Sequence, residues 1–170
     1  MPAITLLEKS EIKSLEERIR DALLDLAVRK GIVKRREDAI VRDILPATDL
    51  GFPAERWAES VTANSWTTIV SMRVPQTKIF VFYGAKSKIS DPLTTLIRFS
   101  EGAAPGRVKD VINVQELSTI NNRELIFEVP ILYENGTYMR IDFYAKATGT
   151  DELILLGYVV EPKGEIISSK

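Results

Sequence analysis

The sequence predicts a mainly β protein (α+β by content), in which an N-terminal helical segment precedes an antiparallel β-sandwich, jelly roll or barrel of about six to eight strands. Apolar residues recur at helical spacing early in the chain, whereas from Trp66 onward they alternate with polar residues at the period of a strand. Helices do not alternate with strands, which argues against a parallel sheet built from strand–helix–strand units.

The chain length suits a single domain. A chain of 170 residues can bury enough apolar surface to fold without disulfides, and it contains no cysteine. We expect residues 1–53 to form a helical arm and residues 54–170 to form the antiparallel β domain, the two making one cooperative unit.

A regular apolar stripe predicts the first helix, which begins near Ser10 and ends before Gly31. The stripe either packs on the protein's own sheet or contacts another subunit, and we take it as the candidate self-association surface. A second, shorter helix is expected from about Arg35 to Leu45, stopped by Pro46. The stripe residues are spaced three and four apart: Ile12, Leu15, Ile19, Ala22 and Leu26.

Alternating and β-branched segments predict the strands of the β domain. Asn135-Gly136 between two β-rich runs predicts a hairpin with a two-residue turn, in which Glu134 faces Thr137. The nearly all-apolar run Leu153–Val160 predicts a central strand that is buried on both faces. The remaining expected strands are Trp66–Val74, Lys78–Tyr83 (closed by Gly84), Leu93–Phe99 and Val108–Leu117.

The composition excludes several chemistries. The chain has no histidine and no cysteine, so it cannot form a Ser-His-Asp triad, a Cys-His dyad or a His-ligated metal site. In the predicted hairpin, Glu128 and Asp142 point to opposite faces, so they make a poor catalytic carboxylate pair. No calcium-loop or Walker motif is present. We therefore expect no enzyme activity, no cofactor and no metal.

One basic stretch is the candidate anion contact, with either lipid headgroups or nucleic acid as the ligand. The alternative is that these cations complete the negative end of the first helix and then line a solvated connector. The net charge of the chain is −1 and no aromatic residues interleave with the stretch, so a nucleic-acid contact is only weakly indicated. The basic residues are Arg29, Lys30, Lys34, Arg35 and Arg36.

Several aromatic residues could form a carbohydrate-binding platform, or could simply stabilise the sheet as cross-strand pairs. In the predicted hairpin, Tyr133 lies across from Tyr138 on the same face. The candidate platform consists of Trp57, Trp66, Tyr133, Tyr138 and Tyr144.

These observations favour a structural or assembly protein of a larger homo- or hetero-oligomeric particle, a class that includes phage and virus capsid, decoration, neck and tail components. The alternative is a β-sandwich or barrel module that binds a small molecule or carbohydrate. The expected partners are copies of the chain and neighbouring subunits. No apolar run is long enough to cross a membrane and no signal peptide is visible, so we expect a cytoplasmic location or a place inside an assembled particle.

Overall fold

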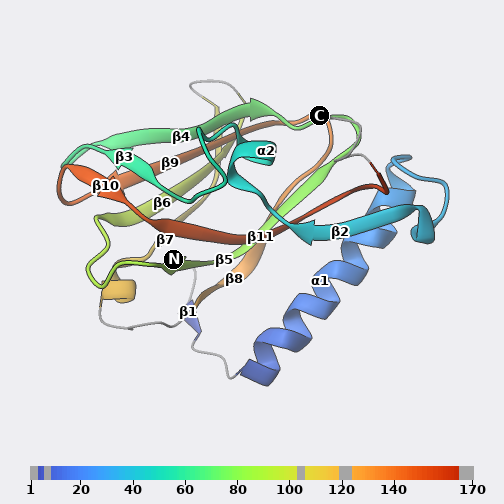
Figure 1. Ribbon diagram of the computed structural model, residues 1–170, viewed down its shortest axis with the longest axis horizontal. Coiled ribbons are helices and arrows are strands. Elements are labelled where there is room, and N and C mark those ends of the chain that lie inside the picture. Colours follow the sequence, from blue (N-terminus) through green and yellow to red (C-terminus); the bar gives the residue numbers. More distant parts are fainter. Residues whose placement is uncertain (1–3, 6–8, 103–105, 119–123, 165–170) are drawn as a thin grey trace.

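Two antiparallel sheets face each other, and one long helix lies against the outer side of one of them (Figure 1). The computed structural model describes residues 4–5, 9–102, 106–118 and 124–164. The long helix is α1 (Lys9–Arg29), and the short helices are η1 (Arg36–Asp38), α2 (Pro46–Leu50) and η2 (Gln115–Ser118).

The strands form two large sheets and one short ribbon. The first sheet has the order β1 (Ile4–Thr5), β8 (Leu125–Tyr133), β5 (Ile79–Ser87), β11 (Leu153–Pro162) and β2 (Ala39–Asp43). The second sheet has the order β4 (Trp66–Arg73), β9 (Tyr138–Ala145), β6 (Thr94–Glu101) and β7 (Arg107–Asn113). The ribbon pairs β3 (Glu59–Val61) with β10 (Gly149–Asp151).

The strand order is that of a jelly roll. Leaving aside β1 and the ribbon, the sheets run β2-β11-β5-β8 and β4-β9-β6-β7, with every pairing antiparallel. The chain repeatedly crosses from one sheet to the other, which produces the eight-stranded double-sheet arrangement of two Greek keys. The predicted fold class is therefore confirmed.

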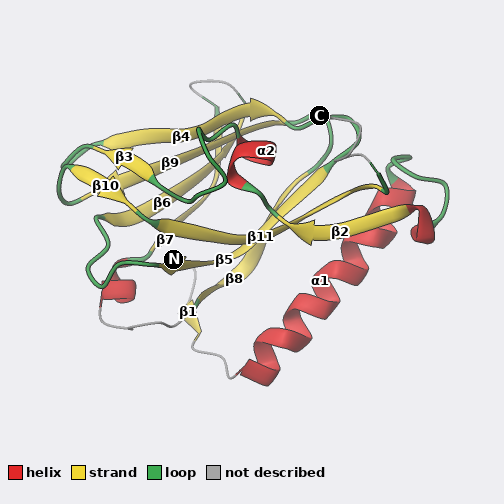
Figure 2. Ribbon diagram, in the orientation of Figure 1, coloured by secondary structure: helices red, strands yellow, loops and turns green. Residues whose placement is uncertain are grey.

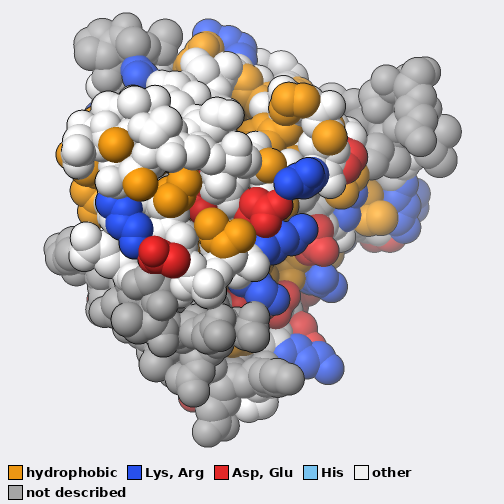
Figure 3. All heavy atoms as spheres, turned by 60° about the vertical axis from the view of Figure 1, so that its left-hand side comes forward, with side chains coloured by type: hydrophobic (Ala, Val, Ile, Leu, Met, Phe, Trp, Pro, Cys, Tyr) orange, Lys and Arg blue, Asp and Glu red, His pale blue; other side chains and the backbone are white. Residues whose placement is uncertain are grey.

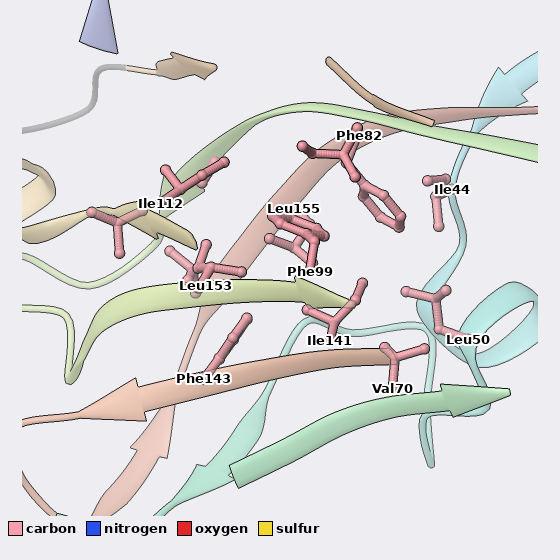
Figure 4. Close-up of a cluster of buried hydrophobic side chains, with 14 of the residues drawn as sticks. Ile44, Leu50, Val70, Phe82, Phe99, Ile112, Ile141, Phe143, Leu153 and Leu155 are labelled. Carbon is pink, nitrogen blue, oxygen red and sulfur yellow. The ribbon is translucent and has the colours of Figure 1, made fainter. Parts of the chain in front are cut away.

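The main core lies between the two sheets (Figure 4). Inward-facing residues of β9 and β6, such as Ile141, Phe143 and Phe99, meet Phe82 of β5 and Leu155 of β11, and all five are buried. These residues sit at alternate positions of their strands, so the period-two pattern of the sequence places them on one face.

A second core lies between α1 and the outer face of the first sheet (Figure 2). Ile19, Leu23 and Ala27 of α1 are buried against that sheet, where Tyr83 and Tyr158 stack with their ring centroids 5.4 Å apart. Strand β11 therefore has apolar contacts on both faces, as its nearly all-apolar sequence predicts.

The prediction of a helix from Arg35 to Leu45 is wrong. After η1 the chain forms β2, which pairs with β11 so that Val41 lies opposite Val160. The β-branched residues Ile40 and Val41 suit this pairing, and tertiary contacts override a weak helical pattern. Pro46 does not stop a helix but begins α2, because proline is favoured in the first turn. Because β2 belongs to the sandwich, residues 1–53 are not a purely helical arm.

The predicted hairpin is also wrong, because β8 and β9 lie in different sheets. Asn135-Gly136 is a turn that carries the chain from one sheet to the other. The Thr137 N–H donates to the Glu134 carbonyl at 3.3 Å, and Gly136 has a φ of 81° while Asn135 does not have a positive φ. A type I′ hairpin turn needs positive φ at both central residues, so half of its backbone signature is missing.

Gly84 does not close a strand, since β5 continues through it to Ser87. A Cβ atom at this position would lie 2.6 Å from the carbonyl oxygen of Leu125 in β8. Glycine therefore permits a close approach of two backbones at an irregularity in the β5–β8 pairing.

The packing of α1 leads to the first prediction. We expect Leu23→Ala to lower the free energy of unfolding by about 2–5 kcal/mol, because it opens a cavity beneath a buried leucine. Leu24→Ala, at a partly buried neighbour on the same helix, should cost clearly less. Urea denaturation of both variants measures this, and equal losses would mean that the helix packs through another face.

Candidate functional site

The outer face of the β4-β9-β6-β7 sheet carries polar and aromatic side chains that α1 leaves uncovered. In β9, the residues that alternate with the core residues are Tyr138, Arg140, Asp142 and Tyr144. The register places β4 and β6 residues beside them, with Trp66 and Leu96 opposite Tyr144, and Thr68 and Arg98 opposite Asp142. We call this surface the Trp66 face and define it by Trp66, Thr68, Arg98, Arg140, Asp142 and Tyr144.

Asp142 holds the centre of the Trp66 face together. Its side chain is only 1% exposed and accepts hydrogen bonds from Thr68 Oγ1 at 2.6 Å, Arg98 Nε at 3.1 Å and Arg140 Nε at 3.3 Å. Arg140 also donates to Thr68 Oγ1 at 3.3 Å. A buried carboxylate needs such partners, and these charge-assisted bonds fix both guanidinium groups in place.

The aromatic residues of this face are held by contacts with their neighbours, and Trp66 is joined to the Asp142 network through Arg98. The Arg98 guanidinium carbon lies 4.1 Å from the centroid of the Trp66 ring, which is a close cation–π contact. Trp66 meets Tyr144 edge to face, with ring centroids 5.3 Å apart. Tyr138 bonds Ser71 through the hydroxyl groups at 2.8 Å. The result is a half-exposed surface whose side chains are already fixed.

The predicted aromatic platform is only partly assembled in the structure. Trp66, Tyr138 and Tyr144 share the outer face, but Trp57 and Tyr133 are buried in the main core. The Tyr133 hydroxyl donates to the Ser100 carbonyl oxygen at 2.9 Å, so this ring is a structural element of the sandwich. The predicted pairing of Tyr133 with Tyr138 fails because the two residues belong to different sheets.

The basic stretch is largely engaged with carboxylates. Lys30 pairs with Glu134, and Arg35 with Asp38 and Glu37. The other members are Arg36, which bridges Asp21 and Asp25 of α1, and the exposed residues Arg29 and Lys34. An anion contact by this stretch remains a prediction, and most of its charge is balanced locally.

The candidate self-association stripe lies mainly against the protein's own sheet. Ile19 is buried there, and Ile12, Leu15 and Leu26 are partly buried beside it, whereas Ala22 is exposed. Self-association through this stripe remains a prediction, but Ile19 is already covered within the chain.

A cluster of four buried or partly buried charges fixes α2 to the edge of the first sheet. Arg42 bonds Asp49 at 2.7 and 2.8 Å and Glu161 at 2.6 Å, while Lys78 lies within 3.5 Å of both carboxylates. The hydrogen bond that Arg42 donates to Asp49 raises the pKa of Arg42 further above its usual value, and Glu161 acts in the same direction, against the effect of burial. Two cations balance two anions, so the cluster presents no excess charge to a ligand.

Glu59 is a buried carboxyl group without a cationic partner among the described residues. It is 4% exposed and lies opposite Asp151 in the β3–β10 ribbon. Its Oε2 accepts the Leu153 N–H at 3.3 Å, whereas Oε1 is buried without a hydrogen-bond partner in the described structure. Burial raises the pKa of Glu59 to about 8, and the charges of Asp151 and Glu152 act in the same direction. Glu59 is therefore mostly protonated at neutral pH.

Charge elsewhere on the surface is mixed. On the face drawn in Figure 3, Lys and Arg side chains lie beside Asp and Glu side chains, and hydrophobic side chains form small scattered groups. Within the described residues, no three Asp, Glu, His or Cys side chains are grouped so that they could hold a metal ion. No helix in the described part of the chain is both long and apolar enough to cross a membrane.

Sequence reasoning did not identify Arg98, Arg140 or Asp142 as parts of a site. The alternation of Tyr138, Arg140, Asp142 and Tyr144 was a signal that they share one face of a strand. Their partners on β4 and β6 follow from the register, which residue patterns alone do not determine across a crossing between sheets.

No protein-family model matches the chain, and no curated protein matches it by sequence.

The raised pKa of Glu59 leads to a prediction on pH. Glu59 keeps its proton up to about pH 8 in the folded state, whereas in the unfolded chain it loses the proton near the ordinary glutamate pKa of 4.5. The free energy of unfolding should therefore fall by up to about 1.4 kcal/mol per pH unit as the pH rises from about 4.5 to about 8. Glu59→Gln should remove this decline and be the more stable form at pH 8.

Urea denaturation of the wild type, Glu59→Gln and the exposed control Glu17→Gln between pH 5 and 9 tests this expectation. The difference between wild type and Glu59→Gln should grow with pH, while the control should follow the wild type. Parallel pH profiles for all three proteins would contradict a buried, protonated Glu59.

Proposed function

We propose that this protein is a non-enzymatic structural or assembly protein of a larger particle, and that it binds neighbouring subunits through the Trp66 face. Particles of this kind include phage and virus capsids and their decoration, neck and tail structures. The proposal is supported mainly by one observation: the partly exposed Trp66 and Tyr144 rings lie beside Arg98 and Arg140, whose guanidinium groups a buried aspartate holds in place.

Residue types favour a protein partner for this face. Tryptophan, tyrosine and arginine are the residues most enriched at the energetic centres of protein interfaces. Side chains that are already ordered lose little conformational entropy on binding, which favours affinity. The jelly-roll fold occurs among viral capsid proteins, but also in lectins and enzymes, so the fold alone adds little.

The alternative is a module that binds a carbohydrate or another small molecule. Three half-exposed aromatic residues on one sheet face, Trp66, Tyr138 and Tyr144, favour it. However, the Arg98 guanidinium already covers one face of the Trp66 ring, which removes one of the two surfaces on which a sugar ring could stack. A protein partner does not need that ring face, so we rank the assembly function first.

The assembly function predicts a specific loss of self-association. Sedimentation velocity from low to high micromolar concentration should show oligomers of the wild type. Trp66→Ala/Tyr144→Ala should remain folded by circular dichroism but sediment as a monomer, because the aromatic centre of the contact is lost. Val129→Ala, which alters a side chain 63% exposed in β8, is the control and should assemble normally.

A wild type that stays monomeric at high micromolar concentration would contradict self-assembly. Binding of the wild type, but not of the double variant, to a carbohydrate array would favour the alternative function instead.

A further inference from the structure

The Trp66 face carries an excess of positive charge within a chain whose net charge is −1. Arg98 and Arg140 share the single carboxylate of Asp142, which is almost fully buried beneath them. Arg73 lies on the same face opposite Tyr138, and its guanidinium group donates to the Gly136 carbonyl oxygen at 2.7 Å. Three guanidinium groups therefore accompany one carboxylate on this side of the sheet.

Both central guanidinium groups keep unused donors. Each arginine has five N–H groups, and among the described residues their hydrogen-bond acceptors are Asp142 and Thr68. The Arg98 and Arg140 side chains are 26% and 22% exposed, so part of each group meets solvent. Because Asp142 fixes the two groups from below, their outer edges offer donors for a second anion.

We infer that the partner surface that docks on the Trp66 face presents aspartate or glutamate side chains to Arg98 and Arg140; this inference rests on the assembly function proposed above. Carboxylates match the fork of a guanidinium group and would neutralise the excess charge. The aromatic pair Trp66–Tyr144 and the neighbouring Leu96 need apolar contacts as well, which a protein surface supplies. Nucleic acid fits less well, because Arg98 occupies one face of the Trp66 ring and so removes a stacking surface for a base.

The same charge argues against two copies meeting through identical faces. A two-fold contact would place the arginines of one copy against those of the other, with each copy's Asp142 buried beneath them, and such like-charge contacts are costly. The partner surface must therefore differ from the Trp66 face, so the contact is heterologous.

Cross-linking in the assembled protein tests this inference. Arg140→Lys keeps the positive charge and introduces an amine, which a carbodiimide joins directly to a carboxylate in contact with it. In an assembly of equal parts of 14N- and 15N-labelled subunits, we expect mixed-label cross-links from position 140 to an aspartate or glutamate. Arg107→Lys, at an 81% exposed side chain that pairs with Glu101, is the matched control and should give no mixed-label product at position 107.

The strength of association at different salt concentrations, with and without the charge at position 140, is a second measurement that does not depend on cross-linking. Arg140→Gln should weaken association at least about tenfold and flatten its dependence on NaCl between 50 and 500 mM. Arg107→Gln should change association less than twofold. Circular dichroism checks whether each variant is folded. If Arg140→Gln does not fold, the NaCl dependence of association is measured on the wild type and on Arg140→Lys instead.

The outcomes separate the two proposals. In one outcome, assembly is lost in Trp66→Ala/Tyr144→Ala while position 140 gives no mixed-label cross-link and association does not depend on salt. That result would overturn the inference of an acidic partner surface and leave the assembly function standing. Mixed-label cross-links that join position 140 of one copy to Asp142 of another copy would overturn the heterologous contact. A wild type that does not assemble would overturn the assembly function and this inference with it.

Discussion

The structure depends on the burial of β11 and β5 on both of their faces. One face of these strands packs into the core between the sheets, and the other packs under α1, where Ile19 and Leu23 cover Tyr158 and its neighbours. A sheet with two apolar faces needs a cover on each side, because exposed apolar surface of that extent would be unfavourable in water. The first helix is therefore used to complete the fold.

That use of α1 determines which surface remains for partners. Because the helix covers the first sheet, the broad sheet face left uncovered by α1 is the outer side of β4-β9-β6-β7 (Figure 2). There the alternation that buries Ile141 and Phe143 points Arg140, Asp142 and Tyr144 outward. A single buried carboxylate then converts two long, flexible arginine side chains into a fixed surface. The proposed interaction face is thus a direct consequence of how the sandwich satisfies its core.

Local patterns predicted the fold class, the first helix and most strands, because spacing along one segment is readable from the sequence. They failed where a distant partner decides the conformation. The segment around Ile40 and Val41 became a strand because β11 was available to pair with it. Asn135-Gly136 became a crossing between sheets because β8 and β9 found other partners. The grouping of Trp66, Arg98 and Asp142 depends on the register of three strands, which local patterns do not contain.

We propose that the Trp66 face, and not α1, is the surface that assembles. Hydroxyl-radical footprinting of the protein at low and at high concentration measures the solvent access of individual side chains. If this is so, oxidation of Trp66 and Tyr144 falls several-fold on assembly, while that of Leu15 and Leu26 in α1 is unchanged. Protection of the α1 residues together with unchanged oxidation of Trp66 would contradict it.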